Sequence, residues 1–254
     1  MSPYFTCEQG TLYHGDCLEV MKHLPEGSID LVLTDPPYGK TQCKWDSVLP
    51  FEPMWVRLHT LIKKNRAIVL FGSEPFSSAL RMSNIKNYKY DWMWEKPHTG
   101  QLNAKKRPLS NIENILVFSV EKTVYFPQFR YDKPYVVTHK GYKGSECYGK
   151  QVDHTTVSDG KRYPKQILSF VHDKNREHPT QKPVALMEYL IKTYTLPEET
   201  VLDFTIGSGT TAVAAVNTGR HFIGIEREEK YCEIAKQRII EAEEKMKESE
   251  IRTH

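Results

Sequence analysis

Two segments of the chain carry residues whose types and spacing could do chemistry. The first is Thr34-Asp35-Pro36-Pro37-Tyr38, which follows residues 29–33, a segment rich in branched side chains. Two prolines fix the backbone and remove two N–H donors, so the local carbonyls are left as free acceptors. Asp35 and the Pro36 carbonyl can each accept a hydrogen bond from an exocyclic amine, and Tyr38 can stack on the ring that bears it. An ordinary proline turn at the end of a strand is the alternative.

The second segment is a strand, a glycine turn and a helix in succession. Gly207 and Gly209 let the backbone pass close to a ligand at the carboxyl edge of a sheet. Glu226 ends the next strand, 23 positions after Asp203, where the ribose of an adenosine ligand would lie. Ala212 stands where a dinucleotide fingerprint has its third glycine, and this fingerprint tolerates alanine at that position. The spacing is therefore compatible with a dinucleotide and with other adenosine ligands. A glycine turn that serves only packing is the alternative to a ligand site.

Strands that alternate with helices must position both segments. The residue patterns predict strands at 11–14, 29–34, 67–71, 88–94, 112–118, 201–204 and 222–226, and helices at 17–24, 51–64, 75–82, 183–194, 210–217 and 228 to about 247. This alternation predicts an open, mostly parallel α/β sheet. From 121 to 177 the pattern breaks into a stretch rich in Tyr, Lys, His and Gly, which we interpret as an inserted, loop-rich region.

Composition limits the class of protein. The 254 residues are 39% hydrophobic and 26% charged, which excludes disorder, collagen and coiled coil as the main state. Mean hydropathy is -0.56 and no long apolar run exists, so we expect no membrane span, no signal peptide and a cytoplasmic protein. Five scattered cysteines and ten histidines form neither Cys-x-x-Cys nor His-x-x-x-His pairs, so we expect no metal site.

The net charge of +3 is unevenly distributed along the chain. Residues 81–182 carry 19 Lys and Arg against 10 Asp and Glu, whereas the remainder carries 16 against 22. A basic middle on an otherwise acidic protein favours a polyanionic partner that is held by one face.

Together, the two segments resemble the amino-methylating DNA methyltransferases that use S-adenosylmethionine. Asp35-Pro36-Pro37-Tyr38 matches their catalytic motif, and Asp203 to Thr211 resembles their cofactor loop. The catalytic motif comes first, as in the permuted beta class of this family. Further segments that resemble the family are 14–17, 94–97, 111–118 and 178–183. The likeness covers nearly the whole chain outside 121–177. Within the family, the chain most resembles phage- or prophage-type adenine methylases.

The resemblance implies a Rossmann-like methyltransferase fold with a mostly parallel, doubly wound sheet. It divides the chain into a catalytic half (1–120), an inserted target-recognition region (121–177) and a cofactor-binding half (178–254). The implied reaction moves the methyl group of S-adenosylmethionine, without a metal, to N6 of a flipped-out adenine in double-stranded DNA. The absence of a Pro-Cys dipeptide disfavours cytosine-C5 methylation, which needs a cysteine nucleophile.

The resemblance also implies the residues of the site. The catalytic residues are Asp35, Pro36, Pro37 and Tyr38. The cofactor-binding residues are Asp16, Cys17, Asp35, Thr180, Lys182, Asp203, Phe204, Thr205, Gly207, Ser208, Gly209, Thr210, Thr211 and Glu226. Charge, and not the resemblance, indicates the candidate DNA-binding residues. They lie in a basic, polar loop close in sequence to the catalytic core and are Gln101, Asn103, Lys105, Lys106 and Arg107. Phe204-Thr205 departs from the usual Pro-Phe of the cofactor loop, and this departure bears on cofactor affinity.

Several alternatives stay open. Cytosine-N4 methylation is the nearest, although that subfamily more often carries Ser at the position of Asp35. Methylation of RNA or of a protein glutamine is a second, and a catalytically silent DNA-binding module on the same fold is a third. A homodimer, a cognate restriction endonuclease and a solitary phage enzyme are each compatible with the sequence.

Overall fold

A computed structural model of the chain describes residues 2–40, 46–96, 104–144, 149–174 and 181–253. The chain forms two compact units. The large unit comprises Met1–Phe126 and Gln166–His254, and the small unit comprises Pro127–Lys165. The small unit lies within the region that the sequence marks as inserted, 121–177.

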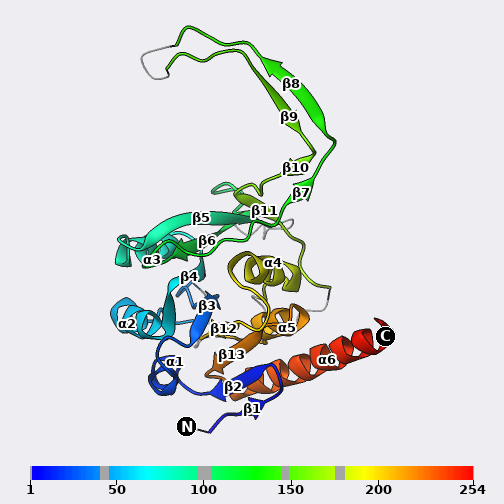
Figure 1. The fold of residues 1–254 in the computed structure, drawn as a ribbon. Coiled ribbons are helices and arrows are strands. Elements are labelled where there is room, and N and C mark those ends of the chain that lie inside the picture. Colours follow the sequence, from blue (N-terminus) through cyan, green and yellow to red (C-terminus); the bar gives the residue numbers. More distant parts are fainter. Residues whose placement is uncertain (1, 41–45, 97–103, 145–148, 175–180, 254) are drawn as a thin grey trace. The chain divides into compact units, whose positions relative to one another are not determined.

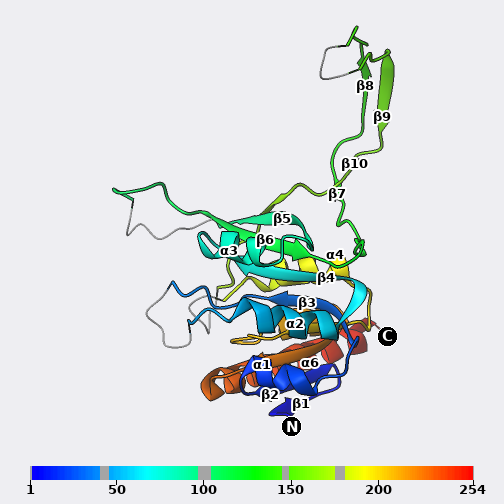
Figure 2. The same cartoon turned by 90° about the vertical axis from the view of Figure 1, so that its left-hand side faces the viewer.

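The large unit is built on one sheet, whose strands within the described residues follow the order β1-β2-β13-β12-β3-β4-β6-β5-β11 (Figure 1). Their bounds are β1 Phe5–Thr6, β2 Gly10–His14, β3 Ile29–Thr34, β4 Ile62–Gly72, β5 Tyr88–Glu95, β6 Ile112–Phe118, β11 Ile167–Ser169, β12 Thr200–Asp203 and β13 His221–Glu226. In Figure 2 the labelled strands β2, β3, β4, β6 and β5 follow one another from bottom to top. Five neighbouring pairs are parallel: β2–β13, β13–β12, β12–β3, β3–β4 and β5–β11. The pairs β1–β2, β4–β6 and β5–β6 are antiparallel. The mostly parallel sheet expected from the sequence is confirmed.

Helices cover both faces of this sheet (Figure 1). Their bounds are α1 Cys17–Val20, a 3-10 turn at Met21–His23, α2 Phe51–Leu61, α3 Phe76–Ser83, α4 Val184–Tyr194, α5 Thr210–Asn217 and α6 Glu229–Thr253. Leu31 and Leu33 of β3 belong to the core beneath α4, α5 and α6, whereas Val32 belongs to the core beneath α1, α2 and α3. A central strand buried on both faces explains why β3 is mostly apolar, with Asp30 as the charged exception. Among the described helices, none is long and apolar enough to cross a bilayer.

One predicted boundary is wrong. The helix expected over 51–64 ends at Leu61, and β4 begins at once with Ile62, which pairs with β3. Lys63 binds the buried carboxylate of Asp30 at 2.7 Å. The charged residues that resemble the solvated end of a helix therefore belong to a strand, because a buried acid on the neighbouring strand provides their partner.

The small unit consists of short antiparallel pairs in one hairpin (Figure 1). Its strands are β7 Arg130–Tyr131, β8 Tyr135–His139, β9 His154–Ser158 and β10 Lys161–Arg162, with β7 paired to β10 and β8 to β9. Every residue of β8 is exposed, so these strands enclose no core of their own. The last strand of the inserted region, β11, belongs instead to the sheet of the large unit.

Candidate active site

The two chemical segments meet at the carboxyl ends of β3 and β12. These strands are parallel neighbours, with Val201 opposite Leu31 and Leu202 opposite Val32. The chain leaves β3 through α2 and leaves β12 through α5, and the two helices cover opposite faces of the sheet. Ligands of open α/β sheets bind in the crevice at such a switch point. A cavity of about 440 Å³ is lined by both segments here, a size typical of small-molecule sites.

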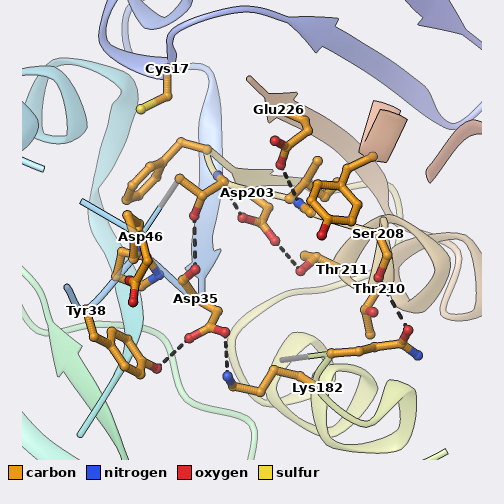
Figure 3. Close-up of a pocket in the computed structure, with 18 of the residues that line it drawn as sticks. Cys17, Asp35, Tyr38, Asp46, Lys182, Asp203, Ser208, Thr210, Thr211 and Glu226 are labelled. Atoms are coloured by element: carbon orange, nitrogen blue, oxygen red, sulfur yellow. Dashed lines mark hydrogen bonds and ion pairs between the residues drawn. The ribbon is translucent and has the colours of Figure 1, made fainter. Parts of the chain in front are cut away.

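The catalytic segment presents Asp35 and Tyr38 to this cavity (Figure 3). The Asp35 side chain is 22% exposed, and its Oδ1 accepts a hydrogen bond from the Tyr38 hydroxyl. That hydroxyl also lies 2.9 Å from Oε1 of Glu113. The Tyr38 ring stacks on Phe76 of α3, with centroids 5.0 Å apart and an interplanar angle of 28°. Tyr38 is therefore held by an aromatic face and by two carboxyl groups.

Lys182, which lies just before α4, completes this arrangement. Its ammonium pairs with Oδ2 of Asp35 and lies 2.9 Å from Oε1 of Glu113. Lys96 approaches the other oxygen of Glu113 at 3.4 Å. The side chains of Lys182 and Glu113 are only 7% and 9% exposed. Two carboxyl groups, two ammonium groups and a phenol thus share one largely buried cluster.

Burial and charge shift the proton affinities of these groups in different directions. Burial raises the pKa of Asp35, and the opposing charge of Lys182 only partly offsets it. Burial also acts to raise the pKa of Glu113, but Lys182 and Lys96 outweigh it and the pKa is lowered. Although burial disfavours an ammonium, the two carboxylates hold the pKa of Lys182 above its usual value. Burial and the same carboxylates raise the pKa of Tyr38 well above its usual value. Asp35 is therefore the carboxyl of this pair that takes up a proton more readily.

Asp203, the last residue of β12, links the two segments through hydrogen bonds. Its buried carboxylate accepts hydrogen bonds from the Thr34 hydroxyl at 3.0 Å, from the Thr205 N–H at 3.1 Å and from the Thr211 hydroxyl. The Thr205 hydroxyl in turn donates to the backbone carbonyl of Asp35 at 3.1 Å. Burial raises the pKa of Asp203 to about 7, despite these donors. Through these hydrogen bonds Asp203 fixes the shape of the turn.

The glycine turn opens toward the cavity on one side and packs tightly on the other. Gly207 has a φ of +54°, and a Cβ there would meet nothing within 4 Å. Gly209 has a φ of +83° and precedes α5, and a Cβ there would lie 2.9 Å from the Cα of Ala235 in α6. The Gly207 N–H donates to Glu226 at 2.9 Å, and the Glu228 N–H donates to the second oxygen of Glu226 at 2.8 Å. Burial raises the pKa of Glu226.

The far side of the cavity is formed by the start of α1 (Figure 3). Asp16 caps this helix and accepts hydrogen bonds from the N–H groups of Leu18 at 2.9 Å and Glu19 at 3.3 Å. Cys17 is buried, and burial raises the pKa of its thiol to about 12. A thiol with so high a pKa is a packing group here and not a nucleophile.

Most of the predicted site residues line this one cavity. They are Asp16, Cys17, Asp35, Pro36, Pro37, Tyr38, Lys182, Asp203, Phe204, Thr205, Gly207, Ser208, Thr210, Thr211 and Glu226. Phe204, where the chain departs from the family pattern, is buried in the core beneath α1, α2 and α3. Gly209 lies outside the lining and gives α5 its close approach to α6. Thr180 lies outside the described residues.

The predicted DNA-binding loop is a separate feature. Lys105, Lys106 and Arg107 are exposed and do not line the cavity, while Gln101 and Asn103 lie outside the described residues. The described part of the chain holds no group of three or more His, Cys, Asp and Glu side chains arranged for a metal.

Sequence reasoning missed the individual roles of Glu113 and Lys96. Both lie in segments that resemble the family, but neither was singled out. One signal was present, since Glu113 is the one charged residue of the mostly apolar strand β6, and a buried acid requires a charged partner.

Comparisons with known proteins agree with this geometry. The sequence model of the N6/N4 methyltransferase family, described as DNA methylase, matches residues 29–237. The DNA adenine methyltransferase YhdJ of Escherichia coli K12 is 29% identical over 256 residues, which cover 92% of this chain and 84% of YhdJ. The crystal structure of the M1.HpyAVI–SAM complex is 29% identical with a TM-score of 0.61, over 90% of this chain and 99% of that chain. PvuII DNA methyltransferase (cytosine-N4-specific), 19% identical with a TM-score of 0.67 over 93% and 88%, is similar in fold. These superpositions confirm the expected fold class.

Proposed function

Because the chain belongs to the N6/N4 family of DNA methylases, we propose that it methylates the exocyclic N6 amine of a flipped-out adenine in DNA. The observation that carries this proposal is the position of Asp35 and Tyr38, which face a cavity shared with the glycine turn. An amine acceptor and a cofactor turn within one cavity are what direct transfer between two small groups requires.

S-adenosylmethionine is the methyl donor, and it supplies an electrophilic methyl group on its sulfonium. The residues present fit this cofactor. Gly207 leaves open space above the turn, and Glu226 presents a carboxylate to the cavity, where it can accept hydrogen bonds from ribose hydroxyls. Asp16 and Cys17 border the adenosine side, and Thr205 and Ser208 border the turn.

Asp35 and the Pro36 carbonyl prepare the amine. Its lone pair is delocalised into the ring, so the amine is a poor nucleophile. Accepting both of its N–H groups favours a pyramidal nitrogen with the lone pair directed at the methyl carbon, and it stabilises the positive charge that develops there. Stacking on Tyr38 fixes the plane of the base. A flipped base is required because the amine cannot be reached inside a duplex.

Adenine is preferred to cytosine in this proposal because position 35 holds an aspartate. Cytosine-N4 methylation keeps the same fold and mechanism and is the alternative that an experiment must separate. A cytoplasmic location, where the enzyme would reach DNA, is part of this proposal. A homodimer and a cognate restriction endonuclease remain partners to be tested.

DNA contacts are proposed for two basic, exposed features. The first is the loop with Lys105, Lys106 and Arg107. The second is the small unit, whose residues include eight Lys and Arg against four Asp and Glu. Tyr131 and Tyr163 in this unit are 76% and 72% exposed. Phosphate contacts by basic side chains, with aromatic rings between them, are typical of nucleic-acid binding.

Nucleoside analysis of cellular DNA tests this proposal. The chain is expressed in a bacterial host whose DNA lacks N6-methyladenine and N4-methylcytosine, and digested DNA is measured by mass spectrometry. We expect N6-methyladenine. If N4-methylcytosine is found instead, the enzyme is a DNA amino-methyltransferase that acts on cytosine and not on adenine. If the DNA is unmodified although the cells contain folded enzyme, the proposal is contradicted.

A further inference from the structure

The carboxylate of Asp35 lies in a larger charged cluster than the acceptance of an amine requires. We call Asp35, Tyr38, Lys96, Glu113 and Lys182 the Asp35 cluster. Its members come from four places in the sequence: the turn after β3, the residue after β5, strand β6 and the residues before α4. With both acids ionised and both lysines charged, the cluster is electrically neutral.

Hydrogen-bond donors of the protein already occupy Asp35. Tyr38 donates to Oδ1, Lys182 donates to Oδ2, and the Thr205 hydroxyl donates to the backbone carbonyl. A flipped base must bring its amine to this carboxylate, whose two oxygens each already accept a hydrogen bond from a side chain, so we expect the amine to take the place of one of these two donors. The Lys182 ammonium is the closer chemical match to the amine, because both groups present N–H donors.

Lys182 has a second place to bind. Its ammonium carries three N–H donors, and it already lies 2.9 Å from Oε1 of Glu113. Release from Asp35 would therefore leave it paired, whereas an unpaired buried ammonium would be strongly unfavourable. Lys96, at 3.4 Å from Glu113, supports the same carboxylate from the other side.

We propose that Lys182 is a positioning residue that occupies the place of the target amine on Asp35, keeps that carboxylate ionised before the base arrives, and then moves its hydrogen bond to Glu113. Glu113 serves as the site that receives the displaced ammonium. This inference rests on the proposed function. It also assigns Lys182 to the target side of the cavity, whereas the resemblance assigned it to the cofactor.

In this proposal Lys182 controls the ionisation of Asp35. A protonated Asp35 loses acceptor capacity and cannot stabilise the positive charge on the amine. Burial and the charge of Glu113 raise the pKa of Asp35, and Lys182 opposes them. The titratable and charged groups that line the cavity with Asp35 are Asp16, Cys17, Tyr38, Lys40, Asp46, Lys96, Glu113, His172, Lys182, Asp203, Glu226, Arg227 and Tyr231.

Two substitutions should move the pH profile of the enzyme in opposite directions. The acid limb of kcat/KM for methyl transfer to DNA reports the proton on Asp35 in the free enzyme. Lys182→Met removes the charge that opposes protonation and should shift this limb to higher pH by about 1 to 3 units. Glu113→Gln removes a like charge and should shift the limb to lower pH. Lys192→Met, on the exposed ion pair with Glu188 in α4, is the matched control and should leave the limb unchanged.

A structural role alone would not produce shifts of opposite sign. Shifts of the same sign, or lower rates with an unmoved limb in both variants, would overturn the proposal. If Lys182→Met does not fold, as thermal unfolding would show, Lys182→Gln removes the same charge while it keeps a donor. The expected upward shift is the same.

A titration without DNA separates this inference from the proposed function. Carboxyl carbon NMR of the aspartates, with the Asp35 signal assigned by Asp35→Asn, measures the pKa directly. We expect it to rise in Lys182→Met and to fall in Glu113→Gln. An unchanged pKa would overturn the inference even in an active methylase. Shifted values in a protein that methylates no DNA would keep the ionic role of Lys182 and reject the exchange with an amine.

Discussion

The ammonium of Lys182 lies against the carboxylate of Asp35, although 147 positions separate the two residues in the chain. Asp35 follows β3 and Lys182 precedes α4, so the ion pair joins the catalytic segment to the second half of the large unit. Neither residue belongs to the glycine turn, yet Asp35 is also fastened to it through the Thr205 hydroxyl. The acceptor of the amine is thus positioned by contacts from both halves of the sequence.

Asp35→Ala should abolish methyl transfer while cofactor binding persists. The substitution removes the acceptor that stabilises charge on the amine, and we expect kcat to fall at least about a hundredfold. The substitution leaves the glycine turn, Glu226 and the start of α1 in place, so the affinity for S-adenosylmethionine in calorimetry should stay within about twofold. An active Asp35→Ala enzyme would contradict the assigned role.

Asp203→Asn should change how stability depends on pH. The pKa of Asp203 is raised from 3.8 to about 7 in the folded protein, so the folded state holds the proton more tightly than the unfolded chain. The stabilisation from this group is fully present below pH 3.8 and is lost as the pH rises through about 7. The free energy of unfolding, measured with urea, should fall from pH 5 to pH 8, and it should fall more in the wild type than in Asp203→Asn. Equal losses would show that Asp203 is ionised without penalty.

The two glycines of the turn should differ in their tolerance of alanine. Gly209→Ala combines a left-handed backbone with a Cβ 2.9 Å from backbone and side-chain atoms of Ala235, and we expect a loss of about 3 kcal/mol. Gly207→Ala is the matched control, because its added Cβ meets nothing within 4 Å, and the left-handed conformation alone costs about 1 kcal/mol. Urea unfolding measures both values, and equal losses would reject the close approach of α5 to α6.

Replacing Lys105, Lys106 and Arg107 together by alanine should weaken DNA binding and flatten its salt dependence. Each lost phosphate contact reduces the slope of log K against log salt by about 0.9. Alanine at three basic residues of α6, namely Lys230, Lys245 and Lys247, removes the same charge elsewhere and should change the slope less. Equal effects of the two triple variants would remove this loop from the DNA-binding face.

Much of the fold and of the site could be predicted from the sequence. The meeting of the two chemical segments at the carboxyl ends of β3 and β12 could be predicted, because each strand leads into an acid and then into a proline turn or a glycine turn. Parallel strands bring their carboxyl ends to one edge, so Asp35, Asp203 and Glu226 converge as expected. The boundary of α2 was wrong because Lys63 finds a buried partner across the sheet, and such a partner leaves no mark in helical periodicity.

The charged cluster around Asp35 could not be predicted in the same way. Spacing along the chain does not show that Lys182, just before α4, contacts Asp35, or that Glu113 of β6 contacts Lys182. The roles of the individual cofactor residues, the target-recognition role of 121–177 and the likeness to phage-type enzymes stay predictions. The paired strands of the small unit were also missed, because exposed strands lack the apolar alternation that marks a buried face.

Methyl transfer from tritiated S-adenosylmethionine to unmethylated genomic DNA tests the central claim most directly. Purified wild-type enzyme and Asp35→Ala are incubated side by side, and the DNA is digested to nucleosides and separated by chromatography. The account predicts label in N6-methyladenine for the wild type and none for Asp35→Ala. Label that is absent from DNA while the wild-type enzyme binds the cofactor, or that persists in Asp35→Ala, would contradict it.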